Sequence, residues 1–234
     1  MRLNKFLAHN GHATRRAADE LIASGKVTIN ARVATLGDKV LETDVVVVAP
    51  PGKGVVQKKL VYLAYHKPVG TITHSPQLGE KDIAQALRGN KGLRDVFPLG
   101  RLDKDSSGLI LLTNDGRITD RLLNPAFEHD KEYEVRVREP IGESVKHKME
   151  RGVDIEGYMT KPALVRLLDE HTFRITLNEG KKHQIRRMAA ALGNVVTDLK
   201  RVRVLNIELG KLAPNSYRTI EGKELQTFLG SLGL

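Results

Sequence analysis

The stretch FPLGRLDKDSSGLILL, residues 97–112, contains the features that decide how this chain folds. Leu109 to Leu112 form a short apolar run that predicts a buried β-strand. The residues before it include a proline and two glycines, which predict a turn leading into that strand. Arg101 and Asp103 lie on this turn, so the sequence predicts a carboxylate and a guanidinium at the edge of the core.

Two explanations of Asp103 need no catalytic role. Asp103, Asp105 and Gly108 match the opening spacing of an EF-hand calcium loop. That loop requires a glutamate at its twelfth position, where this chain has Asn114, and we therefore predict no metal site. In the second explanation Asp103 caps the turn and pairs with Arg101, and for this stretch taken alone the structural role is favoured.

The rest of the chain after residue 60 predicts an α+β domain. Apolar patterning predicts further strands at 61–65, 132–138 and 173–177, and helices at 83–87, 144–149 and 183–192. Tyr133, Val135 and Val137 alternate with charged residues, so they share one face of their strand. Strands and helices do not follow one another as regular βαβ units. The pattern therefore predicts a mixed, mainly antiparallel sheet.

A domain boundary is predicted at Pro50–Gly54, because two prolines and two glycines in five residues end helices and central strands. We expect an N-terminal domain at 1–49 (the head), a linker at 50–60 and a larger domain at 61–234 (the body). Residues 1–60 carry 10 Lys and Arg against 5 Asp and Glu, and the remaining chain carries 28 against 23. This charge density, within a formal net charge of +10, favours a polyanionic partner.

The head is predicted to pack two short amphipathic helices against a small sheet. The expected elements are helices near 3–7 and 18–22, strands at 27–29 and 45–48, the second of them buried, and a turn at 37–38. Gly25 is the expected end of the second helix. Arg15 and Arg16 begin that helix, where free backbone N–H groups favour phosphate. The head therefore presents a basic face.

Composition excludes several classes of protein. The chain has 234 residues and no cysteine, which excludes disulfides, thiolate nucleophiles and cysteine-ligated zinc or iron–sulfur sites. Zinc-dependent base deaminases and cysteine-dependent pyrimidine methylation are excluded with them. No apolar run is long enough to span a bilayer, and no signal-peptide core follows the N-terminus. We therefore expect a cytoplasmic protein without membrane association.

Four segments of the head together resemble the S4 RNA-binding domain. They are RLNKFL at 2–7, TRR at 14–16, GKVTIN at 25–30 and GD at 37–38. They cover nearly the whole head. The resemblance implies that the head binds RNA, and it makes Lys5, Arg15, Arg16 and Lys26 the expected RNA contacts.

Segments of the body resemble the RsuA family of ribosomal RNA pseudouridine synthases. They are, in the family's order, KPVG at 67–70, GRLD at 100–103 followed by SGL at 107–109, KEYEV at 131–135 and GKKHQIRRM at 180–188. With the S4-like head, the resemblance covers essentially the whole chain. The stretch around Asp103 and the segment 184–188 are more similar to the large-subunit RluF type than to the small-subunit RsuA type.

This resemblance implies that Asp103, Tyr133 and Arg186 are catalytic. A carboxylate acts as a nucleophile or a base only when it is ionised, and a nearby cation, here expected to be Arg186, keeps it so. Tyr133 is the expected platform for a uracil flipped out of its stack. Whether Asp103 attacks the sugar, attacks the base or removes a sugar proton stays open. No cofactor is expected, because the isomerisation imports no electron and no group.

Further residues are expected to bind the substrate rather than react with it. They are Arg101, Lys67, Ile185, Arg187, Lys181 and Lys182, the lysines and Arg187 as phosphate contacts. His66 and His183 are histidines near these motifs, but neither has an evident partner at a useful spacing. We therefore expect neither of them to take part in the chemistry.

The expected function is isomerisation of a uridine in structured ribosomal RNA of the large subunit, by a monomer, with transfer RNA as a further RNA partner. A non-catalytic S4-domain RNA-binding or ribosome-assembly factor is the alternative. Such a factor is expected to lack Asp103, Tyr133 or Arg186, and all three are present. A nucleotide-dependent RNA enzyme is disfavoured, because the chain has neither a P-loop nor a dinucleotide glycine fingerprint.

Overall fold

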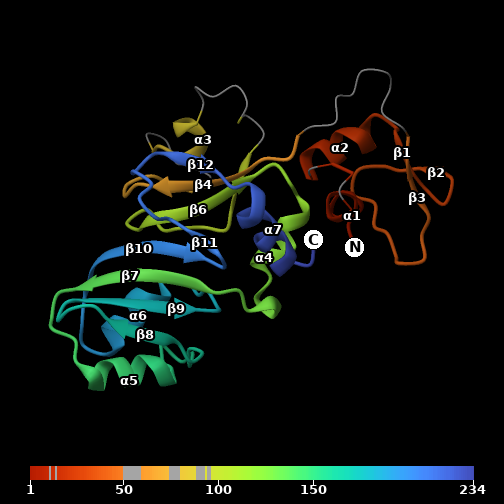
Figure 1. The fold of residues 1–234 in the computed structure, drawn as a ribbon. Coiled ribbons are helices and arrows are strands. Elements are labelled where there is room, and N and C mark those ends of the chain that lie inside the picture. The colour runs from red at the N-terminus through yellow and green to blue at the C-terminus, as the bar shows by residue number, and fades with distance from the viewer. Residues whose placement is uncertain (11, 14, 50–58, 74–79, 88–92, 94–95) are drawn as a thin grey trace.

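A computed structural model describes the chain in two parts, each with its own β-sheet (Figure 1). The described residues are 1–234 without 11, 14, 50–58, 74–79, 88–92 and 94–95. The predicted α+β class with a mixed, mainly antiparallel sheet is confirmed. The boundary predicted at Pro50–Gly54 and most of the predicted linker lie outside the described residues.

The head packs two helices against a three-stranded antiparallel sheet of order β2-β1-β3. Its elements are α1 (Leu3–His9), α2 (Arg15–Ala23), β1 (Val27–Ile29), β2 (Arg32–Val33) and β3 (Val46–Val48). The two predicted helices are confirmed, and their apolar residues, such as Leu7 and Ile22, meet in a core of the head's own. Gly25, with φ of +69°, follows α2 in the left-handed conformation that ends a helix.

The strand expected at 45–48 exists, but the prediction that it is buried is wrong. Val45 and Val47 are 64% and 54% exposed, whereas Val46 and Val48 pack against the head core. The strand pairs on one side with β1, and only one of its faces meets the helices. A run of valines does not distinguish one buried face from two, which is why the sequence was misleading here.

The body is built on a sheet of nine described strands in the order β12-β4-β6-β10-β7-β9-β8, with β11 on β10 and β5 on β6. The strands are β4 (Tyr62–Lys67), β5 (Phe97–Leu99), β6 (Ser107–Thr113), β7 (Lys131–Val137), β8 (Leu164–Leu167), β9 (Thr172–Leu177), β10 (Val196–Val204), β11 (Ile207–Glu208) and β12 (Tyr217–Thr219). Among the described strand pairs, β6 with β10 is parallel and the others are antiparallel.

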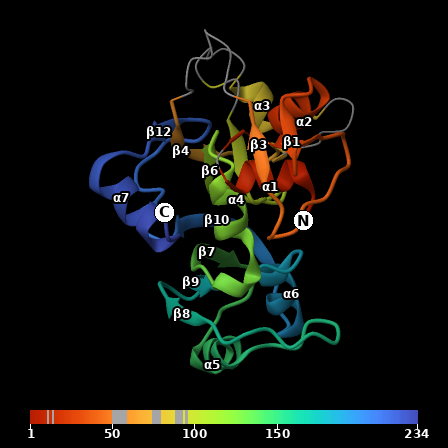
Figure 2. The same cartoon turned by 90° about the vertical axis from the view of Figure 1, so that its right-hand side faces the viewer.

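Helices cover both faces of this sheet. They are α3 (Ile83–Ala86), α4 (Arg117–Leu123), α5 (Glu143–Arg151), α6 (Gln184–Ala191) and α7 (Gly222–Ser231), with a 3-10 turn at Pro125–Phe127. All helices and strands predicted for the body are confirmed to within a few residues. The sequence did not predict β10, α4 or α7. Figure 2 shows α5 at the end of the body farthest from the head.

The central strands β4 and β6 are buried on both faces. Leu109 and Leu111 of β6 pack towards α4 and α7, and Ile110 and Leu112 pack towards α3. A strand covered on both sides has no polar face, so its sequence is a continuous apolar run rather than an alternating one. This explains why residues 109–112 identified the core strand correctly.

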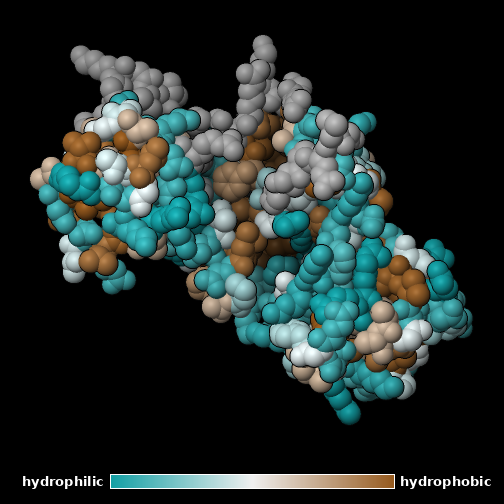
Figure 3. Space-filling view, turned by 180° about the vertical axis from the view of Figure 1, so that it is seen from behind, coloured by the Kyte–Doolittle hydropathy of each residue, from teal (hydrophilic) through white to brown (hydrophobic). Residues whose placement is uncertain are grey.

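The head contacts the body through α1 and α4. Lys5 Nζ lies 3.8 Å from Asp120 Oδ1, and a Cβ added to Gly116 would lie 3.8 Å from the Cβ of Ala8. Ala8 is buried, which shows that the two surfaces are in contact. Seen from behind, hydrophobic side chains gather in the hollow where head and body meet, while hydrophilic ones cover much of the body (Figure 3).

Gly108 sits where β6 approaches β10 most closely. It is paired with Arg201 in the parallel register and has a φ of +107°. A Cβ at this position would lie 2.2 Å from the carbonyl oxygen and 2.6 Å from the amide nitrogen of Arg201. No other residue type fits this backbone conformation without separating the strands.

We therefore expect Gly108→Ala to lower the free energy of unfolding by about 2–4 kcal/mol, through positive-φ strain and overpacking. Urea denaturation measures this. Gly142→Ala is the matched control, because Gly142 has no atom within 4 Å of its added Cβ and precedes α5 at the surface. Equal stability of the two variants would contradict the close approach of β6 to β10.

Candidate active site

Asp103 lies in the loop between β5 and β6, at the edge of the sheet. Gly100, with φ of +79°, begins the loop, and the Ser106 amide donates to the Asp103 carbonyl at 3.1 Å and closes a turn. Thr73 anchors Leu102, the residue before Asp103. The Thr73 hydroxyl donates to the Leu102 carbonyl at 2.9 Å and accepts from the Leu102 amide at 3.1 Å. The side chain of Asp103 is 40% exposed. A well-anchored loop thus presents a carboxylate that a ligand can reach.

Lys67 lies beneath this loop, at the end of β4, with 0% of its surface exposed. Its ammonium group donates to the carbonyls of Thr71 at 2.7 Å, Pro68 at 3.1 Å and Lys104 at 3.5 Å. It therefore joins the turn after β4 to the loop that carries Asp103. Its predicted role as a phosphate contact is wrong, because a fully buried ammonium group cannot reach RNA.

Burial sets the charge state of Lys67. Loss of hydration lowers the pKa of Lys67 to about 8, although the carboxylates of Asp103 and Asp105 act in the opposite direction. The nearby guanidinium of Arg201, which is also buried, lowers it further. The active-site loop thus rests on a lysine whose charge is costly to bury.

Arg186, on α6, fixes the other side of the loop. Its guanidinium donates to the carbonyl of Asp105 at 3.0 Å and to the carbonyl of Val196, the first residue of β10, at 3.2 Å. In this structure Arg186 therefore binds the backbone of the Asp103 loop. The expected pairing of its guanidinium with the Asp103 carboxylate is not among its contacts.

The carboxylate of Asp103 instead faces His183. Its Oδ1 lies 3.5 Å from His183 Nε2, and the His183 side chain is 49% exposed. The sequence did not predict this pair, because the partners are 80 positions apart and come together only when α6 packs beside the β5–β6 loop. The available signal was the place of His183 within the GKKHQIRRM segment, immediately before α6.

A buried carboxylate, Glu179, organises the segment that carries His183. It accepts hydrogen bonds from the Tyr158 hydroxyl at 2.6 Å, the Gln184 side chain at 2.6 Å and the Lys161 amide at 3.0 Å. Burial raises the pKa of Glu179, but these hydrogen bonds outweigh it and the net shift is downward. Lys181 completes the network, with its ammonium 4.2 Å from the centre of the Tyr158 ring.

The remaining predicted contacts divide into two groups. Arg101 and Lys182 are exposed and free to meet RNA, and Lys181 is exposed above Tyr158. Ile185 is 4% exposed and packs in the core, so its predicted substrate contact is wrong for this structure. The guanidinium of Arg187, predicted to contact phosphate, pairs in this structure with Glu156 and with the carbonyl of Ile155, both at 2.7 Å.

Tyr133, on β7, lies between the two parts of the site. It is half-buried and packs against two hydrophobic clusters. One cluster contains Leu102, which precedes Asp103, and the other contains Ile185, which precedes Arg186. The three predicted catalytic residues therefore come from segments that meet at Tyr133.

The predicted RNA contacts of the head lie in different settings. Arg15 and Lys26 are exposed. Lys5 pairs with Asp120 of the body and takes part in the contact between the two domains. The side chain of Arg16 lies outside the described part of the chain.

Two comparisons with known families identify the chain. Residues 61–191 match the model of the family described as RNA pseudouridylate synthase, and residues 1–46 match the S4 domain. The chain belongs to the RNA pseudouridylate synthase family. This pseudouridine synthase is therefore an isomerase with an N-terminal S4 domain, and the resemblance to RsuA-type enzymes inferred from its sequence is confirmed.

Similar proteins extend the match over nearly the whole chain. The dual-specificity RNA pseudouridine synthase RluF of Escherichia coli (strain K12) is 40% identical over 96% of this chain and 77% of the relative. The ribosomal large subunit pseudouridine synthase B of Bacillus subtilis (strain 168) is 36% identical over 96% and 94%. A crystal structure of a pseudouridylate synthase has a TM-score of 0.71 and 29% identity over 99% of both chains.

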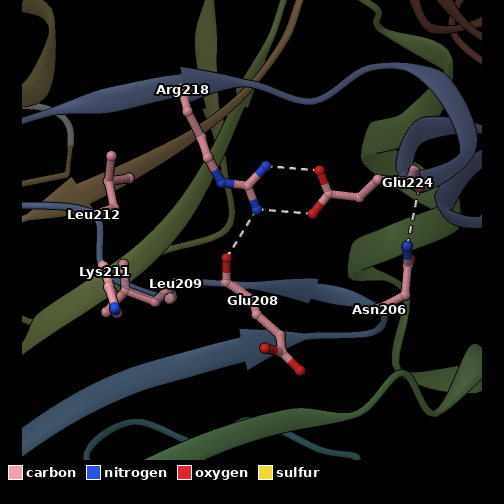
Figure 4. Close-up of a pocket in the computed structure, with 8 residues that line it drawn as sticks. Asn206, Glu208, Leu209, Lys211, Leu212, Arg218 and Glu224 are labelled. Atoms are coloured by element: carbon pink, nitrogen blue, oxygen red, sulfur yellow. Dashed lines mark hydrogen bonds and ion pairs between the residues drawn. The ribbon is translucent and has the colours of Figure 1, made fainter.

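The described residues contain no group of three or more His, Asp and Glu side chains placed to bind a metal ion. No helix in the described ranges combines the length and apolar character needed to cross a membrane. A pocket lies away from Asp103, between β11 and α7 (Figure 4). Its polar groups bind one another: Arg218 donates to both Glu224 carboxylate oxygens, at 2.6 and 2.8 Å, and to the Glu208 carbonyl. These hydrogen bonds hold β11, β12 and α7 together.

The buried charge of Lys67 predicts a pH dependence of stability. Below about pH 8 the amine is protonated in the folded and the unfolded chain alike. Between about pH 8 and its ordinary pKa of 10.5 the unfolded chain keeps a proton that folded Lys67 has released, so the contribution of Lys67 to stability increases with pH. We expect the unfolding free energy of wild type minus that of Lys67→Met to rise across this interval.

Urea denaturation of both proteins at several pH values measures this difference. The exposed Lys211→Met is the control, for which the difference from wild type stays constant. A constant difference for Lys67→Met as well would show that Lys67 is hydrated rather than buried.

Proposed function

We propose that this enzyme isomerises a uridine in ribosomal RNA of the large subunit, with Asp103 as its catalytic carboxylate. The observation that carries the proposal is the half-exposed Asp103 side chain, on a loop fixed by Lys67 from below and Arg186 from the side. The names of two relatives support the choice of RNA: one is a ribosomal large subunit enzyme and the other has dual specificity. Transfer RNA is a second candidate substrate.

The proposed reaction requires only groups of this chain and the uridine itself. The bond between N1 of uracil and C1′ of the sugar breaks, the uracil rotates, and C5 forms a bond to C1′. The proton of C5 is then lost and N1 gains one, so atoms and electrons balance without a cofactor. Because Asp103, Tyr133 and Arg186 all come from one chain, a monomer is sufficient.

Each of the three residues has a distinct proposed task. Asp103 acts as nucleophile or base at the sugar or the uracil, a task that requires the carboxylate form. Tyr133, which is half-buried, is the platform for the flipped uracil. Arg186 keeps the Asp103 loop in place through the Asp105 carbonyl.

We expect Asp103→Asn to lose at least about a hundredfold in the rate of pseudouridine formation, because the amide is neither a nucleophile nor a base. RNA binding is expected to remain. Pseudouridine mapping on unmodified large-subunit, small-subunit and transfer RNA measures both activity and target choice.

Asp105→Asn is the matched control in the same loop. Asp105 meets Arg186 through its backbone carbonyl, so its variant keeps most of the activity. Full activity of Asp103→Asn would refute the proposed chemistry, and modification confined to transfer RNA would refute the proposed substrate.

We also propose that the head binds RNA phosphates through its exposed basic residues. Arg15→Gln with Lys26→Gln is expected to weaken RNA binding and to reduce the slope of log K against log salt concentration by about 1 for each lost phosphate contact. Filter binding at several salt concentrations measures the slope.

The control pair is Lys148→Gln with Arg151→Gln, which removes the same charge from α5 at the far end of the body. This pair is expected to leave the slope unchanged. An equal loss of slope in the two double variants would mean that net charge alone, and not the head surface, governs binding.

A further inference from the structure

We propose that His183 is the ion-pair partner of Asp103 and acts as a positioning residue for its carboxylate. The inference rests on the proposed role of Asp103 and adds to it a residue that the sequence did not single out. It also predicts how the reaction rate depends on pH.

The first argument is the distribution of cations around Asp103. Lys67 is buried and donates to three backbone carbonyls, and Arg186 donates to two. Lys104, the next residue in the loop, pairs with Glu80 at 3.0 Å. These cations are all bound elsewhere, whereas His183 Nε2 lies 3.5 Å from the carboxylate itself.

The second argument is the backbone of His183. Its φ of +52° and ψ of +30° lie in the left-handed region, which few residues other than glycine adopt and which histidine, asparagine and aspartate tolerate better than most. The segment is fastened on both sides of it: the Lys181 amide donates to the Gln184 side chain at 2.9 Å, and the Arg187 amide donates to the His183 carbonyl at 2.9 Å. A non-glycine residue kept in this conformation by its surroundings is a sign of a positioned side chain.

The third argument is chemical. Histidine is the side chain that ordinarily gains or loses its charge between pH 5 and 8. When protonated, His183 attracts the Asp103 carboxylate and keeps it oriented; when neutral, it gives no such attraction. The other charged residues of the segments that meet here are Arg101, Lys104 and Asp105 in the loop, Lys67 below it, and Lys182 and Arg186 in the segment that carries His183. Lys67, whose pKa burial lowers to about 8, is present in every variant, so the difference between the wild-type and His183→Asn profiles, and not the rate itself, reports on His183.

The test compares His183→Asn, His183→Lys and wild type in single-turnover reactions with saturating RNA from pH 5.5 to 8.5. Asparagine tolerates the left-handed backbone and removes the charge, while lysine keeps a charge at every pH of the series. At pH 6 we expect His183→Asn to be about three- to fivefold slower than wild type, the scale of a partly exposed ion pair. The ratio of the wild-type rate to the His183→Asn rate falls to about one by pH 8.5, whereas the ratio of the His183→Lys rate to the His183→Asn rate stays constant.

His147→Gln is the matched control, because His147 also pairs with a carboxylate, Glu143, but on α5 far from the site. It is expected to follow the wild-type profile. A His183→Asn profile parallel to that of wild type, with the fall in rate between pH 6 and 8 still present, would overturn the proposal.

A measurement without RNA separates this inference from the proposed function. Unfolding free energies of wild type, His183→Asn, Asp103→Asn and the double variant form a double-mutant cycle. A favourable coupling at pH 6 that disappears at pH 8.5 supports the pair even if no pseudouridine is formed, in which case only the proposed function fails. Additive effects at both pH values would overturn the pair.

Discussion

The parallel pairing of β6 with β10 is the constraint on which the architecture of the body depends. It joins the strands β12, β4 and β6, which lead to Asp103, to the strands β10, β7, β9 and β8, which carry Tyr133 and support α6. The strands approach so closely that only glycine fits at position 108, and the Arg201 side chain donates to the Leu109 carbonyl at 2.7 Å across the junction. The two parts of the active site are therefore brought together by backbone geometry.

Around the pairing of β6 with β10, cationic side chains mainly donate hydrogen bonds to backbone carbonyls. Lys67 binds carbonyls of two loops, and Arg186 binds carbonyls of the Asp103 loop and of β10. Charge-assisted hydrogen bonds are stronger than neutral ones and better able to fix a loop that has no secondary structure. This arrangement anchors the Asp103 loop and leaves its carboxylate facing His183.

In the proposed function, the head adds affinity for RNA without being part of the reaction site. Its own core lets it fold as a unit, and its contact with α4 fixes it beside the body. Arg15 and Lys26 remain on its surface. A polyanion such as RNA is attracted by such a surface at long range, and the site in the body then needs to select only one nucleotide.

Local patterns in the sequence determined the class of fold, most helices and strands, and the family. These patterns, such as the apolar run at 109–112 and the GRLD and GKKHQIRRM segments, each consist of consecutive residues and can be recognised without the tertiary structure. Tertiary structure alone decided which charges meet. It buried Lys67 and Ile185, directed Arg187 to Glu156, and placed His183 beside Asp103. These outcomes depend on how β6, β10 and α6 pack, and contacts between segments some 80 residues apart leave no periodic trace in either segment.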